Sequence, residues 1–239
     1  KSTTLYASLN EVDRAENKII TVEDPIEYNL SGINQCQVNE RIGLTFPSIL
    51  RAVLRQDPNI IVIGEIRDVE TAEIAVTSAL TGHLVMSTLH TNDAPSAITR
   101  LVDMGIKPFL ISSSIQAILA QRLVRIICPK CKVPYKVEKD VLESLNVDSI
   151  DVENMEFCHG TGCDYCNKTG YRGRKPIFEF MSMNTELRDA IFNKMPTNEL
   201  RKIAHSNGMT TLAEDGLRLA RAHVTTLEEV MRITSLDSM

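Results

Sequence analysis

Three apolar runs in the first third of the chain do not alternate with polar residues. They are Ile19–Val22, Ile60–Ile63 and the run that follows His83, and each ends in a polar or acidic tip. Unalternating apolar runs are typical of strands buried on both faces of a parallel sheet. The stretches Phe46–Gln56 and Val69–Leu80 lie between them and have the length of crossover helices. This order predicts an α/β protein with polar groups at the carboxyl ends of parallel strands.

The pattern after the third apolar run predicts further helices. Ala94–Met104, with Pro95 in its first turn, and Pro108–Arg125 each have the character of a helix. A charged stretch, Glu138–Leu145, also looks helical.

Residues 176–239 are expected to be helical throughout. One helix follows Thr197 and ends before Gly208, and Thr225-x-x-Glu228 has the pattern of a capping box for the last helix. We therefore expect an α/β core over residues 1–126, an insertion over 127–175 and a helical subdomain over 176–239.

Composition narrows the class of protein. The 239 residues contain 43% hydrophobic and 24% charged positions, which excludes a disordered or fibrous chain. The formal charge of -5 and the aromatic content of 5% argue against a protein that holds nucleic acid by bulk positive charge or by stacking. The sequence has no apolar run of about 18 residues, the length that would span a bilayer. We expect a soluble intracellular protein.

Four of the six cysteines form two C-x2-C pairs. The pairs are Cys128–Cys131 and Cys163–Cys166, with glycines close to the second. Four thiolates in two tight turns suit tetrahedral Zn²⁺, and no position is left open for a catalytic water. Redox chemistry is the alternative use of such pairs, but neither follows a strand in the thioredoxin manner. The sequence predicts a structural zinc site, with Cys36 and Cys158 outside it.

Several polar residues at the predicted strand ends are candidates for nucleotide chemistry. Lys1 and Ser2 precede an apolar helical pattern, as the end of a phosphate-binding loop does, although a polar N-terminus alone reads the same way. Glu65 follows a buried strand, where an acid holds Mg²⁺ indirectly or polarises the attacking water. A helix cap or surface carboxylate is its alternative role. The first strand is followed by a second acidic group, Glu23, Asp24 and Glu27, which suits Mg²⁺-bound water or a solvated turn.

Histidines and arginines add less specific candidates. His83 and His90 flank the third strand at a spacing that does not fit a helical metal pair, so they are candidates for sensing or orienting phosphate, or for a structural role. Arg51 and Arg55 lie four apart on one helical face, where they suit contact with a neighbouring subunit's phosphates. Salt bridges to nearby carboxylates remain an alternative for both.

Four segments together carry a family resemblance. ITVEDPIEY, GLTFPSILRAVLRQDPNIIVIGEIRDVETAEIA, TGHLVMSTLHTNDA and CPKC…GCDYCNKTGYRGR follow one another along essentially the whole chain. In this order they resemble the bacterial secretion ATPases, and more narrowly the type II secretion assembly ATPases and type IV pilus extension ATPases. The resemblance implies a RecA-like P-loop core with a zinc-binding insertion and a C-terminal helical subdomain. It also implies a homo-hexamer, peripheral at the cytoplasmic face of the inner membrane, that hydrolyses ATP to assemble pilins or pseudopilins.

The resemblance assigns roles to particular residues. It implies that Lys1 and Ser2 end the Walker A loop and that Glu65 is the Walker B acid. Glu23 to Glu27 match the family's Asp box and His83 to His90 its His box, and Arg51 and Arg55 match phosphate-facing arginines. The paired cysteines match the family's zinc subdomain, which retraction ATPases lack; an extension or secretion motor is therefore favoured.

The chain also departs from the family pattern. The Walker A glycines and the N-terminal half that contacts inner-membrane platform proteins would lie upstream, so we expect this piece alone to bind nucleotide and hydrolyse ATP poorly. His223 stands where relatives commonly have a glycine before the last helix. The competing hypothesis is a non-catalytic adaptor that binds through its zinc knuckle.

Overall fold

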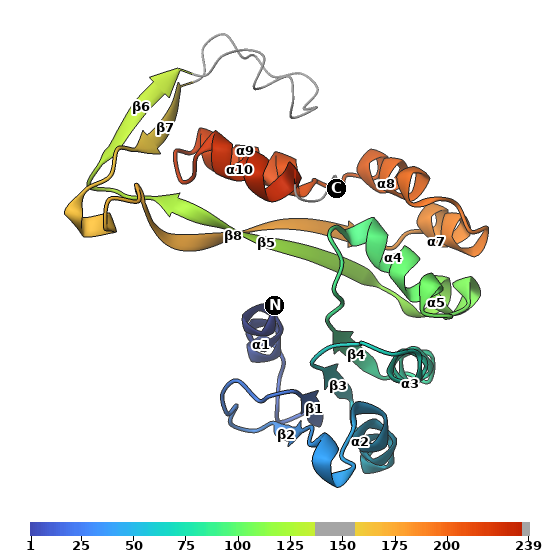
Figure 1. Ribbon diagram of the computed structural model, residues 1–239. Helices are drawn as coiled ribbons and strands as arrows, with labels where there is room; N and C mark the ends of the chain where they lie inside the picture. The colour runs from blue at the N-terminus through green and yellow to red at the C-terminus, as the bar shows by residue number, and fades with distance from the viewer. Residues whose placement is uncertain (137–155, 236–239) are drawn as a thin grey trace. The chain divides into compact units, whose positions relative to one another are not determined.

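The computed structural model describes residues 1–136 and 156–235 (Figure 1). Contacts divide the chain into two compact units that interleave along the sequence. Unit 1 consists of Lys1–Thr91, Pro95–Ala117 and Ser182–Ile203, and unit 2 of Asn92–Ala94, Ile118–Met181 and Ala204–Met239. Domain boundaries at residues 126 and 175 remain a prediction.

Unit 1 is built on a four-stranded parallel sheet in the order β2-β1-β3-β4. The strands are β1 (Ile19–Glu23), β2 (Asn34–Gln37), β3 (Ile60–Ile63) and β4 (Leu84–Ser87). Ile19 pairs with Ile60, which in turn pairs with Leu84. The predicted α/β class with a parallel sheet is confirmed. The edge strand β2 was not predicted, because its residues are polar and short-range pattern alone does not distinguish it from a loop.

Both faces of this sheet are buried, which explains the unalternating apolar runs. Helix α1 (Ser2–Asn10) covers one face and packs against Ile19, Ile60 and Val62. Helices α2 (Phe46–Val53) and α3 (Val69–Leu80) lie on the other side of the strands in Figure 1, where residues such as Ile20 and Ile61 form the core. Because strand side chains alternate, Thr21 and Glu23 share the face that α1 covers.

The helices of unit 1 begin at recognisable caps. The Thr45 side chain accepts from the Ser48 N–H in a capping box for α2, and the Asp68 side chain accepts from the Thr71 N–H at 2.8 Å to cap α3. The predicted helices over 46–56, 69–80 and 94–104 are confirmed. The remaining elements are η1 (Glu40–Ile42), η2 (Leu54–Gln56), α4 (Ala94–Asp103), α5 (Pro108–Ser114), α7 (Thr185–Phe192) and α8 (Thr197–Ser206).

The single helix predicted over Pro108–Arg125 is wrong. The chain forms α5 only to Ser114, turns extended at Ile115, and continues as strand β5 (Ala117–Ile127). The buried positions Ala120, Val124 and Ile127 are spaced by four and three, which also fits a helix, so the pattern was ambiguous. Pairing with a strand some fifty residues downstream decides the matter.

In its described residues, unit 2 combines two small sheets with two helices. β5 pairs with β8 (Tyr171–Ser182), and β6 (Lys132–Lys136) pairs antiparallel with β7 (Glu156–Gly160). The other elements are η4 (Asp164–Cys166), α9 (Leu212–Arg221) and α10 (Leu227–Ser235). The expectation that residues 176–239 are helical throughout is wrong, because β8 extends to Ser182. The expected helix over 138–145 lies outside the described residues. None of the described helices has both the length and the apolarity to cross a bilayer.

The cap of α10 lies one residue later than predicted. The hydroxyl of Thr226, not Thr225, accepts from the N–H three residues on, that of Glu229, at 3.1 Å. The Thr225 hydroxyl donates instead to the Arg125 carbonyl on β5 at 2.8 Å. Thr225 and Thr226 are each followed by a glutamate three residues later, so the sequence pattern alone does not determine which of the two caps α10.

His223 ends α9 in a left-handed conformation. Its φ is 56°, its N–H donates to the Ala220 carbonyl, and the Val224 N–H donates to the Leu219 carbonyl, which together form a Schellman motif. The buried Nδ1 of His223 has no hydrogen-bond partner among the described residues. A residue with a side chain is strained at this φ, whereas glycine adopts it without strain.

We expect His223→Gly to raise the free energy of unfolding by about 0.5–1 kcal/mol, because glycine adopts this φ without strain. His223→Ala is the matched control, since it removes the imidazole but keeps the strain. Urea unfolding monitored by circular dichroism measures both. A glycine variant no more stable than the alanine variant would contradict the assignment of strain to this position.

A buried carboxylate joins α10 to β5. The side chain of Glu229 is 0% exposed; it accepts from Arg125 at 2.8 Å and from Arg232 at 2.9 Å. Burial by itself raises the pKa of Glu229, but hydrogen bonds from Arg232 and Arg125 outweigh it and lower the pKa to about 2. The carboxylate therefore favours folding above the ordinary glutamate pKa, and that contribution is lost as the pH falls through about 2.

We expect Glu229→Gln to lower the free energy of unfolding by about 2 kcal/mol near neutral pH, because hydrogen bonds to a charged group are lost. The difference between the two proteins should shrink as the pH falls from about 5 to about 2, where the wild-type carboxylate takes up a proton. Urea unfolding of both proteins across this range measures it. A difference that does not change with pH would count against the ionised pair.

Candidate active site and metal centre

A pocket of about 230 Å³ lies at the carboxyl ends of β1, β3 and β4, beside the start of α1. Parallel strands end at one edge of a sheet, so residues far apart in the sequence meet there. The pocket brings together most of the predicted site residues, namely Lys1, Ser2, Glu23, Asp24, Glu27, Glu65 and His90.

The start of α1 forms one wall of the pocket. The nine-residue helix begins at Ser2, so its first N–H groups, which have no partner within the helix, lie beside the pocket. A helix N-terminus of this kind attracts anions. Lys1 adds a positive charge, and its ammonium donates to the Leu89 carbonyl in the loop after β4. This wall can hold phosphate oxygens.

Hydrogen bonds tie the three strand ends together. The Gly64 N–H donates to the Val22 carbonyl at 2.8 Å, and a Cβ at Gly64 would lie 3.3 Å from that carbonyl oxygen. The hydroxyl of Thr88 donates to the Gly64 carbonyl at 2.8 Å, and the Ile66 N–H donates to the Thr88 carbonyl at 3.0 Å. The position of the neighbouring Glu65 is therefore held by backbone on both sides.

Glu65 is largely buried and carries two basic partners. One of its carboxylate oxygens accepts from Arg67, and the other lies 3.0 Å from His90 Nε2. The hydrogen bond from Arg67 is the main cause that lowers the pKa of Glu65; burial opposes it, and His90 adds to the lowering. Arg67 also lies 3.7 Å from Asp24. Glu65 is therefore an ionised carboxylate, able to accept a hydrogen bond or a proton from a group in the pocket.

The acids after β1 differ in their surroundings. Glu23 is buried and accepts from the hydroxyls of Tyr6 and Thr21 and from Gln35 Nε2. Asp24 is more exposed and lies near Arg67. The cluster predicted as one acidic group thus contains an acid that is held firmly and others that face the solvent.

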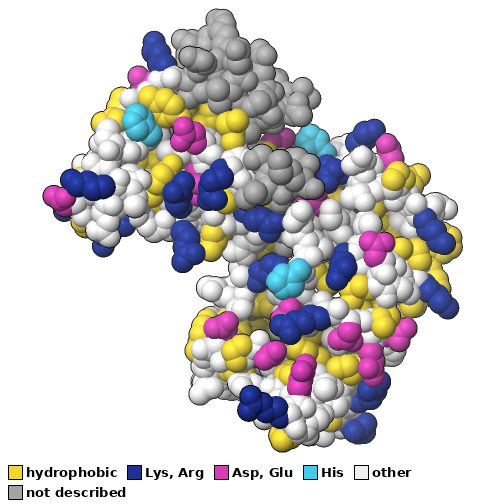
Figure 2. Space-filling model, viewed as in Figure 1, with side chains coloured by type: hydrophobic (Ala, Val, Ile, Leu, Met, Phe, Trp, Pro, Cys, Tyr) yellow, Lys and Arg dark blue, Asp and Glu magenta, His cyan; other side chains and the backbone are white. Residues whose placement is uncertain are grey.

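Three predicted site residues do not line this pocket. Arg51, on the outside of α2, forms an ion pair with Glu70, and Arg55 is exposed in η2. His83 precedes β4 and so lies at the opposite end of that strand, where its Nδ1 is 3.0 Å from the Ser78 carbonyl at the end of α3. Acidic and basic side chains are interspersed on the face shown in Figure 2, so an arginine beside a carboxylate does not by itself mark a phosphate site.

Sequence reasoning missed Tyr6 and Thr88, which also line the pocket. The helical pattern after Ser2 by itself assigns no role to Tyr6. A usable signal was available: Thr21 and Glu23 fall on one face of a strand that is otherwise apolar, and the helix covering such a face needs a polar partner for them. Tyr6 supplies that partner.

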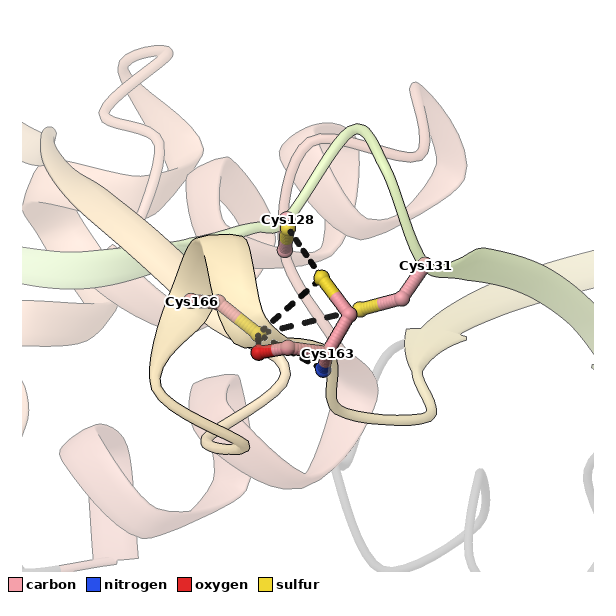
Figure 3. Close-up of side chains that lie close together, drawn as sticks. All are labelled: Cys128, Cys131, Cys163 and Cys166. Carbon is pink, nitrogen blue, oxygen red and sulfur yellow. Dashed lines mark hydrogen bonds between the residues drawn. The ribbon is translucent and has the colours of Figure 1, made fainter.

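The four paired cysteines form a cluster in unit 2 (Figure 3). Their sulfur atoms point toward one another and all lie within 4.8 Å. The Sγ of Cys163 is 3.8 Å from those of Cys128 and Cys166, and Cys131 Sγ is 3.9 Å from Cys166 Sγ. Four sulfurs bound about 2.3 Å from a zinc ion at tetrahedral angles stand about 3.8 Å apart. The cluster therefore fits one tetrahedral metal ion, and its spacing is too wide for disulfides.

Backbone N–H groups stabilise thiolate at this cluster. Cys163 N and Gly170 N donate to Cys166 Sγ at 3.2 and 3.3 Å. Burial raises the pKa of Cys166, but these two donors, together with the Cys163 and Cys131 side chains, outweigh it and lower the pKa to about 6. Gly160 and Gly170 also let two backbone segments approach, since a Cβ at Gly160 would lie 2.1 Å from the Gly170 carbonyl oxygen and a Cβ at Gly170 2.4 Å from the Gly160 carbonyl oxygen. Two other cysteines lie elsewhere, Cys158 in β7 and Cys36 in β2.

The parallel sheet and the pocket at its carboxyl edge place the chain among the α/β proteins that bind ligands at strand ends. Comparison with known sequences then identifies its family: the model of the Type II/IV secretion system protein family matches residues 1–232, and the chain belongs to that family. It is 52% identical over 98% of its length to the type II secretion system ATPase E of Vibrio cholerae. It is 48% identical over 98% of its length to the type IV pilus assembly ATPase PilB of Thermus thermophilus.

The chain spans 46% of the Vibrio protein and 26% of the Thermus protein. Among solved structures it is similar to the pilus retraction motor PilT with bound ADP, with a TM-score of 0.71 and 30% identity; the match covers the whole of this chain and 60% of PilT. It shares its fold with the ATPase DotB of Legionella pneumophila at a TM-score of 0.69 and 23% identity, over 98% of this chain and 57% of DotB.

Proposed function

We propose that the chain is the motor part of an ATPase that drives assembly of pilins or pseudopilins in type IV pilus extension or type II secretion. The observation that carries the proposal is the pocket at the carboxyl edge of the sheet. It combines a helix N-terminus and an ammonium group for phosphate with carboxylates at two strand ends. The names of the related proteins and the ADP bound to PilT support the same function. The fold is then a RecA-like P-loop core.

The pocket residues have different roles in phosphoryl transfer from ATP to water. Lys1 and the first N–H groups of α1 hold the phosphate oxygens, and the Ser2 hydroxyl would hold Mg²⁺, with Glu23, Asp24 and Glu27 acting through water. Mg²⁺ held there would supply positive charge against the charge that develops on the phosphates. Glu65 accepts a hydrogen bond from the attacking water and orients it, and His90 fixes the carboxylate of Glu65.

The remaining predicted residues act outside this pocket. We assign Arg51 and Arg55 to a homo-hexamer interface, because both are exposed on unit 1, Arg51 on α2 and Arg55 on η2, which follows it. There an arginine can reach a neighbouring subunit's phosphates. His83 lies at the amino end of β4, away from the pocket of its own subunit, with its Nδ1 3.0 Å from the Ser78 carbonyl at the end of α3. A phosphate contact by His83 would therefore be to a neighbouring subunit's nucleotide.

We assign zinc to the cysteine cluster, in a structural role, because four thiolates fill a tetrahedral site. The three-part organisation with a zinc subdomain over 127–175 is part of the same proposal. We also place the protein at the cytoplasmic face of the inner membrane. There the remainder of the full-length protein would bind the inner-membrane platform proteins.

Release of phosphate from Mg-ATP by the full-length protein tests the proposed function. A zinc-knuckle adaptor would not need the pocket, and a full-length protein that binds no ATP and releases no phosphate would favour that alternative. Secretion and pilus assembly are separated by asking whether deletion of the gene abolishes exoprotein release or surface pili.

A further inference from the structure

A buried hydrogen-bond network lies beneath the pocket, and the chemistry assigned above does not explain it. At its centre is Glu23, which is only 5% exposed. Among the described residues no lysine, arginine or histidine forms an ion pair with this carboxylate; its partners are uncharged donors from Tyr6, Thr21 and Gln35. Burying a carboxylate costs free energy unless hydrogen bonds compensate, and these three donors supply that compensation for Glu23.

The geometry of the donors fixes the direction of the carboxylate. An ionised carboxylate offers about four acceptor positions. Tyr6 takes one on Oε2, while Thr21 and Gln35 take two on Oε1, the latter at 3.0 Å. One acceptor position therefore remains for the pocket, which Glu23 lines.

Tyr6 is the donor that comes from the phosphate-binding helix. It lies one helical turn after Ser2 on α1, is 2% exposed, and packs among Leu9 and Val62 on the covered face of the sheet. Its ring stands edge-on to that of Tyr28, with centroids 4.6 Å apart. Burial, followed by the hydrogen bond to Glu23, raises the pKa of Tyr6 to about 12, so the hydroxyl remains a proton donor. Packing of the ring and the hydrogen bond of the hydroxyl together fix the position of the Tyr6 side chain.

The network continues from the helix to the edge of the sheet. Gln35 on β2 donates to Glu23, and its Oε1 accepts from the Leu30 N–H at 2.7 Å. A displacement of α1, which begins at the pocket, therefore acts on Glu23 and through it on the loop between β1 and β2.

We infer that Tyr6 is a positioning residue whose hydroxyl holds the Glu23 carboxylate in one orientation, aimed into the pocket, and that it couples the helix after Lys1 to the acidic loop after β1. The inference rests on the proposed function, in which Glu23 would act on Mg²⁺ through water during ATP hydrolysis.

The test is Tyr6→Phe in the full-length protein, which removes the hydroxyl and keeps the ring. We expect kcat for ATP hydrolysis to fall about 10-fold with KM changed by less than about 2-fold, since misplacement of one group affects the transition state more than ground-state binding. A purely structural role would lower Tm without this selective fall in kcat.

Two further variants complete the experiment. Tyr28→Phe is the matched control, because its hydroxyl makes no contact with Glu23 in the described structure, and it should keep the wild-type kcat and KM. Gln35→Leu removes another donor to the same carboxylate and should also lower kcat with little change in KM. Wild-type kcat in Tyr6→Phe would overturn this inference alone. An unaltered protein without ATP turnover would overturn the proposed function and this inference with it.

Discussion

We expect the full-length protein carrying Glu65→Gln to hydrolyse ATP about 10²–10⁴-fold more slowly than the wild type, the range typical for loss of a general base. Glutamine has the size of glutamate but carries no charge, so it cannot polarise the attacking water. It also leaves Arg67 and His90 without the carboxylate that they share. Phosphate release at saturating Mg-ATP measures the effect.

Nucleotide binding should separate this loss from misfolding. Lys1 and Ser2 are untouched by the substitution, so we expect the Kd for ATP to change by less than about 3-fold, in keeping with an interaction made mainly in the transition state. Glu73→Gln is the matched control, because Glu73 is exposed on α3 and does not line the pocket; its kcat should equal that of the wild type. Full activity of Glu65→Gln would remove Glu65 from the catalytic assignment.

The second large effect concerns the cysteine cluster. The purified protein should contain one zinc ion per chain by elemental analysis, and Cys131→Ser should lose most of it. Structural zinc contributes apparent free energies of about 10–16 kcal/mol in small zinc domains. Even a fraction of that corresponds to a fall in Tm of more than about 10 °C for a chain of this size. Hydrogen exchange should then show opening of β6, β7 and the segment around η4.

The other two cysteines are built-in controls for the metal site. Cys36 lies in β2, and Cys158 lies in β7 outside the group of four. Serine at either position should leave the zinc content at one per chain, although Cys158→Ser places a hydroxyl in a buried site and so lowers Tm modestly. A protein that contains no zinc, and whose melting a chelator does not change, would exclude the metal assignment.

Much of the pocket could be predicted because it depends on a general property of parallel sheets. Glu23 is the last residue of β1, and Glu65 and His90 follow β3 and β4; parallel strands bring their carboxyl ends to one edge whatever the details of packing. The same rule explains why His83 lies outside the pocket: it precedes β4 and is therefore at the opposite end of the strand. The positions of these residues relative to the strands were enough to predict both results.

Residues whose partners come from distant elements could not be placed in the same way. Arg51 sits on an amphipathic helix with polar neighbours, and only the packing of α2 beside α3 determines that Glu70 is its partner. Tyr6 meets Glu23 because α1 covers one particular face of β1. A helical period reports which residues face inward, but not which strand residue they meet.

The sequence by itself determined the parallel α/β class, the carboxyl-edge pocket and the two cysteine pairs, because each follows from short-range patterns: unalternating apolar runs, polar strand tips and C-x2-C turns. Only the tertiary structure decided that residues 117–127 are a strand, that Thr226 caps α10, and that Glu23 is held by Tyr6. These outcomes depend on pairing with β8, on the register of α10 against β5, and on the packing of α1. Local propensity allows more than one answer in each case, and burial against a distant partner selects one of them.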